Sequence, residues 1–191
     1  MPVMTTSGTH NPAYHPQNEE VRSDQEKIDQ KFRRTSIRLA RRNEGQTAEN
    51  PSVAALVVKY IDHQPVIVGR GVTAIGGRPH AEVEALNEAG AAAKGAHVYV
   101  TLEPCSHFGK TPPCADALID AGVSRVVVAA NDPDDRVSGR GFEKLRAAGI
   151  EVVKNLLSQE AEYGLAGYLM RKRNVRPFVT LKMAMTNDGF I

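Results

Sequence analysis

The sequence reads HAE at residues 80–82 and PCSHFGKTPPC at residues 104–114. His80, Cys105 and Cys114 offer the nitrogen and sulfur ligands that zinc prefers, and these two cysteines are the only ones in the chain. Three protein ligands leave one tetrahedral position open, which is typical of a catalytic zinc site. The two segments are therefore expected to meet in the fold, each at the start of a helix.

Glu82 lies two residues after His80 and is expected to face the same cleft without binding the metal. Zinc lowers the pKa of a water molecule in the open position towards ~7. A neighbouring carboxylate can then carry a proton from that water to a departing amine. The pattern predicts a zinc-dependent hydrolytic deaminase with Glu82 as its catalytic acid and base.

A purely structural zinc site is the alternative interpretation of these residues. Structural sites normally use four protein ligands. His107, two residues after Cys105, is the nearest candidate for a fourth ligand.

Strand and helix patterns alternate around these motifs. Apolar runs of strand length cover 52–59, 65–71, 97–102, 123–129 and 150–154, and helical patterns that end at glycine cover 80–89, 115–121 and 142–148. This alternation predicts an α/β fold with a largely parallel sheet covered on both faces. The order of elements resembles the three-layer α/β/α cytidine-deaminase-like fold, whose central sheet is mixed and largely parallel.

The N-terminal part of the chain divides into two segments. Residues 1–22 are polar, contain three prolines and show no hydrophobic period, so we expect a disordered tail. The main domain is expected to span 23–156 and to begin with a helix from about 24 to 43. Ile28, Phe32, Thr35 and Leu39 would form its buried stripe. The arginines at 33–42 are interpreted as a solvated face rather than a phosphate or RNA surface.

Composition excludes several classes of function. The chain has 191 residues and a net charge of +2, with 41% hydrophobic and 5% aromatic residues and no Trp. These values argue against a nucleic-acid surface, which would show a basic stripe or stacking aromatics. No apolar run reaches the ~20 residues that span a membrane, and no signal peptide is recognisable. We therefore expect a cytoplasmic protein with reduced thiols.

Five stretches carry a resemblance to a known family: NPSV at 50–53, GRPHAE at 77–82, TLEPCSHFGKTPPCADALI at 101–119, DP at 132–133 and GRG at 139–141. Together they resemble the deaminase domain of the riboflavin-biosynthesis deaminase/reductase family, over roughly residues 34–191. The resemblance implies one catalytic Zn²⁺ and a phosphorylated pyrimidine substrate, 2,5-diamino-6-ribosylamino-4(3H)-pyrimidinone 5′-phosphate. It also implies substrate contacts for Asn50, His107, Lys110 and Asp132. Thr73 and Asp134 stand where many members carry His and Asn.

The C-terminal residues extend the same resemblance. Residues 157–175 are expected to form a linking helix, and 176–191 resemble the first strand of the family's reductase domain. A whole further domain would need ~100–200 more residues, so NADPH is not an expected cofactor of this chain. Self-association or association with a separate reductase chain would give the strand a neighbour.

Two other functions stay open at the level of sequence. One is a different zinc deaminase, acting on a free base, a nucleoside or tRNA. The other is a non-catalytic assembly module that zinc stabilises. The eight residues between Cys105 and Cys114, which include His107 and Lys110, distinguish this chain from the usual P-C-x-x-C spacing of zinc deaminases.

Overall fold

A computed structural model describes residues 16–134, 137–154 and 156–190. The strands are β1 (Ala54–Ile61), β2 (Gln64–Val72), β3 (His97–Leu102), β4 (Arg125–Ala130) and β5 (Glu151–Val153). The α-helices are α1 (Pro16–Ala40), α2 (Ala81–Ala89), α3 (Cys114–Asp120), α4 (Arg140–Ala147), α5 (Ser158–Gly164) and α6 (Ala166–Asn174). Short 3₁₀ turns cover Arg41–Asn43, Ile75–Gly77 and Gly90–Ala93.

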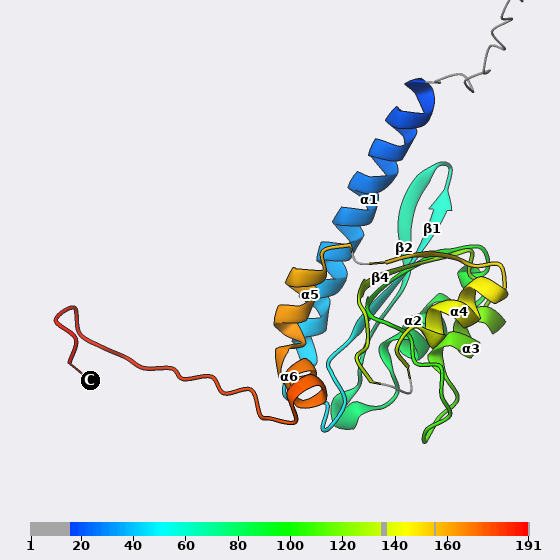
Figure 1. Cartoon of the computed structure of the whole chain (residues 1–191). Coiled ribbons are helices and arrows are strands. Elements are labelled where there is room, and N and C mark those ends of the chain that lie inside the picture. The colour runs from blue at the N-terminus through cyan, green and yellow to red at the C-terminus, as the bar shows by residue number, and fades with distance from the viewer. Residues whose placement is uncertain (1–15, 135–136, 155, 191) are drawn as a thin grey trace, which may run out of the picture.

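The five strands form one mixed sheet in the order β2-β1-β3-β4-β5. β1 pairs antiparallel with β2 and β3, whereas β3, β4 and β5 pair in parallel. Four strands therefore share one direction and β1 opposes them. Helices α2, α3 and α4 lie on one side of the sheet, and α1 and α5 lie on the other (Figure 1). This arrangement confirms the expected three-layer α/β/α architecture.

Alternation along the strands builds the two faces of the core. Val98 and Val100 of β3 pack with the helices α2, α3 and α4, whereas Tyr99 between them packs against Phe32 of α1. This period of two is what a strand with both faces covered requires. The aromatic rings of Phe32 and Tyr99 lie 5.3 Å apart at their centroids, which fixes α1 on the sheet.

Helix α2 rests directly on the outer strand β2. A side chain at Gly69 and one at Gly71 would both lie on the face of that strand towards α2, since the two residues are two positions apart. A Cβ atom at Gly69 would overlap the carbonyl oxygen of Ala85, and one at Gly71 would overlap that of Ala81. The two glycines therefore permit a backbone-to-backbone approach that no larger residue allows.

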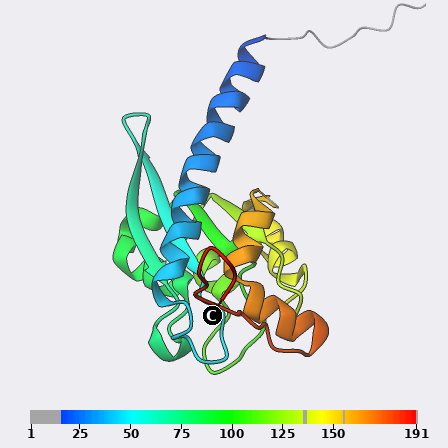
Figure 2. The ribbon, with the colours of Figure 1, turned by 90° about the vertical axis from the view of Figure 1, so that its left-hand side faces the viewer.

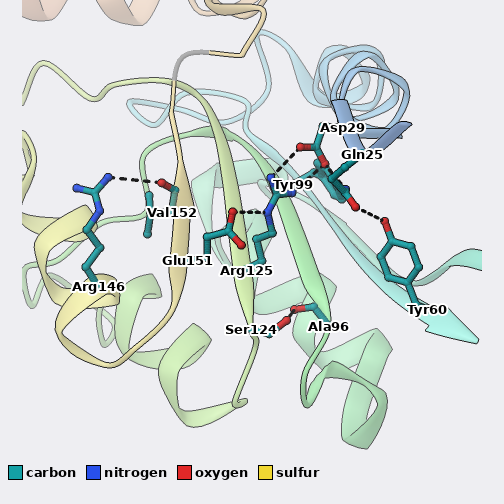
Figure 3. Close-up of polar contacts among 10 residues, drawn as sticks. All are labelled: Gln25, Asp29, Tyr60, Ala96, Tyr99, Ser124, Arg125, Arg146, Glu151 and Val152. Carbon is teal, nitrogen blue, oxygen red and sulfur yellow. Dashed lines mark hydrogen bonds and ion pairs between the residues drawn. The ribbon is translucent and has the colours of Figure 1, made fainter. Parts of the chain in front are cut away.

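A buried polar network attaches α1 to the face of the sheet opposite α2 (Figure 3). Arg125 of β4 donates two hydrogen bonds to the Asp29 carboxylate at 2.8 and 2.9 Å, and the Tyr99 hydroxyl donates a third at 2.8 Å. Burial opposes ionisation of Asp29, but Arg125, Tyr99 and Gln25 together hold its pKa below the ordinary value. The carboxylate is thus fully engaged inside the protein.

We expect Asp29→Ala to lower the free energy of unfolding by about 3–5 kcal/mol, because both terminal nitrogens of the buried Arg125 guanidinium lose their carboxylate and only the pair between Nε and the largely exposed Glu151 remains. Lys27→Ala is the matched control: its pair with Asp24 is exposed and is worth about 1 kcal/mol or less. The folded-state pKa of Asp29 lies below the unfolded value of ~4, so its contribution is present above that pH and is lost as the pH falls through the folded-state value. Urea titrations at pH 7 and pH 3 would measure both effects. A loss no larger than that of Lys27→Ala would contradict this account.

The face that α1 buries differs from the predicted stripe. Thr35 is exposed, and Asp29, Arg33 and Ser36 are buried instead. Arg33 is 0% exposed, and its Nη1 donates to the carbonyl oxygen of Val100 at 2.8 Å. The interpretation of the arginine cluster as a solvated face was therefore wrong for Arg33, since a long side chain can reach a strand carbonyl across the helix–sheet interface; the other arginines are exposed.

Helix α1 begins at Pro16, inside the segment 1–22 that was expected to be a disordered tail. That prediction was wrong for 16–22: proline fits the first turn of a helix, where its missing N–H would have no helical partner. Residues 1–15 lie outside the described part of the chain, so the remainder of that prediction stays untested.

The C-terminal part also departs from expectation. The linking segment forms two helices, α5 and α6, that meet at Leu165, rather than one helix, and α5 packs against α1 (Figure 2). Residues 176–190 form no strand, because ladder hydrogen bonds require a neighbouring strand and none lies beside them in the described structure; the segment runs away from the protein body (Figure 1). Among the described helices, none is both long and apolar enough to cross a membrane.

Candidate metal centre and substrate pocket

The three predicted zinc ligands converge. The ligand atoms of His80, Cys105 and Cys114 all lie within 4.8 Å of one another. His80 Nδ1 is 3.3 Å from Cys114 Sγ and 3.7 Å from Cys105 Sγ. Zinc–sulfur and zinc–nitrogen bonds of about 2.3 and 2.0 Å would place tetrahedral ligands roughly 3.5 Å apart. The donor set and its spacing therefore fit a zinc ion.

Secondary structure brings these ligands together. His80 directly precedes α2, Cys105 follows the carboxyl end of β3, and Cys114 is the first residue of α3. Helices α2 and α3 pack side by side on the same face of the sheet. The chain thus places the starts of two helices beside the end of a parallel strand, where α/β folds commonly hold their ligands.

The two thiols are not equivalent. The hydrogen bond with the Cys114 thiol lowers the pKa of Cys105 to about 4, and the Cys114 backbone N–H also donates to Cys105 Sγ at 3.3 Å. The same thiol–thiol contact, with burial, raises the pKa of Cys114. Cys105 is therefore the thiolate before metal binding, and a bound cation would favour deprotonation of both.

Glu82 lies in the second position of α2 and is 4% exposed. Burial, together with the nearby Cys105 thiolate, raises the pKa of Glu82 to about 7. The carboxylate also interacts with the Cys114 thiol, which places it beside the metal ligands. A bound metal cation would lower the pKa of Glu82 and so favour its ionised carboxylate form.

His107 does not join the ligand group. Over the described residues, the cluster with metal-ligand spacing consists of His80, Cys105 and Cys114. The buried Nδ1 atom of His107 has no hydrogen-bond partner in this part of the chain. The four-ligand structural site therefore lacks its candidate fourth ligand, which favours the open tetrahedral position of a catalytic site.

A cavity of about 540 Å³ opens above the ligand group. This volume is within the range of ligand pockets for small molecules. Its lining contains all the residues for which substrate contacts were expected: Asn50, His107, Lys110 and Asp132. Glu82, His80 and Cys105 line it as well. The cavity thus brings these seven predicted residues together, whereas Cys114 is buried and is not part of its lining.

Two of these side chains are already held by the protein. Asn50 Nδ2 donates to the carbonyl oxygen of Gly77 at 2.8 Å, and Asp132 Oδ1 accepts from the hydroxyl of Tyr168 at 2.8 Å. Thr73 lines the same cavity, and its hydroxyl accepts the backbone N–H of Val53 at 3.0 Å. These bonds fix the orientation of the pocket wall before a ligand enters.

Sequence reasoning missed several residues of the pocket. Arg78 reaches across its mouth and donates from Nη1 to Thr111 Oγ1 at 2.6 Å. Tyr168, Arg171 and Lys172 of α6 form a further part of the wall. The adjacency of Arg78 to the metal motif was a usable signal, but nothing in the sequence indicates that α6 folds back over the cavity.

Glu103 is a second buried carboxylate in the lining, at 3% exposure. Burial raises its pKa, and backbone N–H groups of Gly139, Asp132 and Phe142 oppose that shift. Two of these groups belong to the start of α4 and its preceding turn. Neither oxygen of Glu103 has a hydrogen-bond partner within the described residues, and the groups that shift its pKa do not include the metal ligands, which do act on Glu82. Glu82 is therefore the better candidate for proton transfer.

Comparison with known proteins agrees with this geometry. Residues 26–130 match the family described as the cytidine and deoxycytidylate deaminase zinc-binding region. The riboflavin biosynthesis protein RibD of Aquifex aeolicus is 49% identical over 162 residues, which cover 85% of this chain and 44% of that protein. The diaminohydroxyphosphoribosylamino-pyrimidine deaminase of Buchnera aphidicola subsp. Schizaphis graminum is 43% identical over 142 residues, which cover 74% of this chain and 94% of that protein.

Solved structures give the same result. A structure of Acinetobacter baumannii RibD superposes with a TM-score of 0.78 at 44% identity, covering 86% of this chain and 45% of that chain. The deaminase/reductase of Thermotoga maritima gives a TM-score of 0.78 at 40% identity, and the match covers 86% of this chain and 46% of that chain. The chain thus spans less than half of the RibD proteins that it matches. It belongs to the cytidine and deoxycytidylate deaminase zinc-binding family and, within it, to the diaminohydroxyphosphoribosylaminopyrimidine deaminases of the RibD type.

Proposed function

We propose that this chain catalyses the hydrolytic deamination of 2,5-diamino-6-ribosylamino-4(3H)-pyrimidinone 5′-phosphate in riboflavin biosynthesis. The products are ammonia and 5-amino-6-ribosylaminouracil phosphate. The observation that carries the proposal is the buried Glu82 carboxylate beside a three-ligand zinc site, on the wall of a cavity of about 540 Å³. Membership of the deaminase family supports the choice of substrate.

His80, Cys105 and Cys114 would hold the metal. When bound, zinc supplies the Lewis acidity that makes water nucleophilic near neutral pH. Glu82 accepts one proton from the attacking water and delivers it to the ring nitrogen. It then carries the second proton from the new hydroxyl group on C2 to the amine, which leaves as ammonia while the C2 carbonyl forms. Burial of Glu82 suits this cycle, because a carboxylate shielded from bulk water passes its proton to the substrate rather than to solvent.

Four side chains are proposed to orient the substrate. Asn50 would hydrogen-bond the pyrimidinone edge, and Asp132 would accept from a polar group of the substrate. His107 and Lys110 stand on the loop between the two cysteines and would bind the phosphorylated ribosyl part. Their common position around one cavity supports these roles.

Arg78 adds a second cation to the phosphate-binding side. Its guanidinium forms no ion pair within the described residues, so its charge is available to a ligand. We expect Arg78→Ala to raise the KM for the phosphorylated substrate roughly tenfold, with a smaller effect on the dephosphorylated compound. Arg78→Lys should recover part of the loss. Equal losses with both compounds in steady-state assays would argue that Arg78 acts on the fold instead.

The test of the proposed function is ammonia release from the diaminopyrimidinone ribotide by the zinc-loaded chain. Free bases, cytidine, deoxycytidylate and tRNA complete the panel, because another zinc deaminase would prefer one of them. Turnover of the ribotide above all others supports the proposal, and preference for another member identifies a different deaminase. Bound zinc without turnover of any member would favour the assembly module.

Association with a second copy or with a reductase chain is part of the same proposal. Six exposed apolar side chains in the segment after α6 support it: Phe178, Val179, Leu181, Met183, Met185 and Phe190. A partner that pairs with this segment would cover them. Sedimentation of the chain with and without residues 176–191 would test it.

A further inference from the structure

Two buried carboxylates lie together at one end of the cavity. Asp132 is 7% exposed and Asp134 is 9% exposed, and both line the cavity wall. The backbone N–H of Asp134 donates to Asp132 Oδ1 at 2.9 Å, so the two residues form one tight turn. Neighbouring like charges disfavour each other's ionised form, and a phosphate group would add further negative charge to the same cavity.

Two side chains of helix α6 contact this acidic pair. The Tyr168 hydroxyl donates to Asp132 Oδ1 at 2.8 Å, and Lys172 Nζ forms an ion pair with Asp134 Oδ2 at 2.6 Å. The two residues are four positions apart and so share one face of the helix. Both line the cavity, although α6 follows residues 26–130, which match the zinc-binding family model.

The balance of charge around the cavity makes Lys172 consequential. Among the described residues, the lining carries five carboxylate side chains, from Glu49, Glu82, Glu103, Asp132 and Asp134. Four lysine or arginine side chains oppose them, from Arg78, Lys110, Arg171 and Lys172. Removing Lys172 would shift the net charge of these lining residues by one unit towards negative, and it would remove the lysine that pairs with the buried Asp134.

We propose that Tyr168 and Lys172 of α6 determine substrate specificity: Lys172 neutralises Asp134 so that the pocket accepts a phosphorylated substrate, and Tyr168 orients Asp132. With Oδ1 of Asp132 occupied by two donors, Oδ2 is the oxygen presented to a substrate hydroxyl or amine. Tyr168 is thus a positioning residue. The inference rests on the proposed function, since it concerns how that substrate is selected.

A charge-swap series in the full zinc-loaded chain tests the role of Lys172. Lys172→Gln should raise the KM for the phosphorylated substrate at least ~10-fold more than that for the dephosphorylated compound, because it adds a net negative charge to the cavity. The double variant Lys172→Gln/Asp134→Asn restores the charge balance and should recover most of that selectivity. Asp134→Asn alone should not raise the KM for the phosphorylated substrate. Tyr168→Phe should lower kcat/KM roughly five- to tenfold for both compounds.

Several results would overturn the inference. These are equal effects of Lys172→Gln on both compounds, a double variant no better than the single one, or a raised KM in Asp134→Asn. The KM of Asp134→Asn for the phosphorylated substrate remains informative even if Lys172→Gln fails to fold. If the unaltered chain deaminates neither compound, the proposed function fails. Calorimetric titration with ribose 5-phosphate then decides the inference, since Lys172→Gln must bind it more weakly and the double variant must recover.

Discussion

Glu82→Gln should reduce ammonia release by about 10²- to 10⁴-fold while leaving the zinc content unchanged. Glutamine keeps the size of the side chain and can still hydrogen-bond, but it cannot accept a proton and return it. Because Glu82 is 4% exposed, solvent is poorly placed to replace its carboxylate. The loss should therefore fall on kcat, with little change in KM.

Glu84→Gln is the matched control for this experiment. Glu84 lies two residues after Glu82 in the same helix, is half-buried, and is not part of the cavity lining. Its substitution should leave turnover within about twofold. Zinc content by atomic absorption and a thermal melt would accompany both variants. Retention of more than a tenth of the activity in Glu82→Gln would exclude Glu82 as the proton carrier.

Loss of the metal should abolish turnover altogether. We expect Cys105→Ser to purify with little zinc and to show only background ammonia release, because a hydroxyl is a far weaker zinc ligand than a thiolate. The pKa of Cys105, lowered to about 4, makes it the readier of the two thiols to bind as a thiolate. The melting temperature should also fall, because zinc joins the starts of α2 and α3.

Reconstitution distinguishes a catalytic from a purely stabilising metal. Stripping zinc from the unaltered chain with a chelator and restoring it should return both activity and melting temperature, whereas Cys105→Ser should recover neither. Zinc restored to Glu82→Gln should recover the melting temperature alone. Full turnover by the stripped chain would contradict a zinc-dependent reaction.

Residue type and spacing were sufficient to predict the metal centre. His80, Cys105 and Cys114 carry unusual chemistry at positions that a strand–helix alternation brings to one edge of the sheet. The same alternation predicted the layers, because strands that alternate with helices form a largely parallel sheet covered on both faces. The zinc ligands and the layered fold follow from patterns that are local in the chain.

The residues that were missed depend on contacts between distant segments. Tyr168 meets Asp132 across 36 residues, and Arg33 meets Val100 across 67. Nothing in the local sequence separates Arg33 from its exposed neighbours, or marks Lys172 as part of a pocket. These outcomes depend on how α1 and α6 pack on the body, and packing selects among helix faces that the sequence pattern leaves equivalent.

The close contact between α2 and β2 bears on how the centre can be re-engineered. His80 and Glu82 begin a helix whose depth is set by Gly69 and Gly71, neither of which lines the cavity. If the metal ligands were transplanted onto another scaffold, their relative positions would change unless the host strand also carried glycine at the two positions that contact the helix. The minimal portable unit is therefore the β1–β2 hairpin with α2, β3 and the loop from β3 to α3, and the two glycines belong to that unit as much as the ligands do.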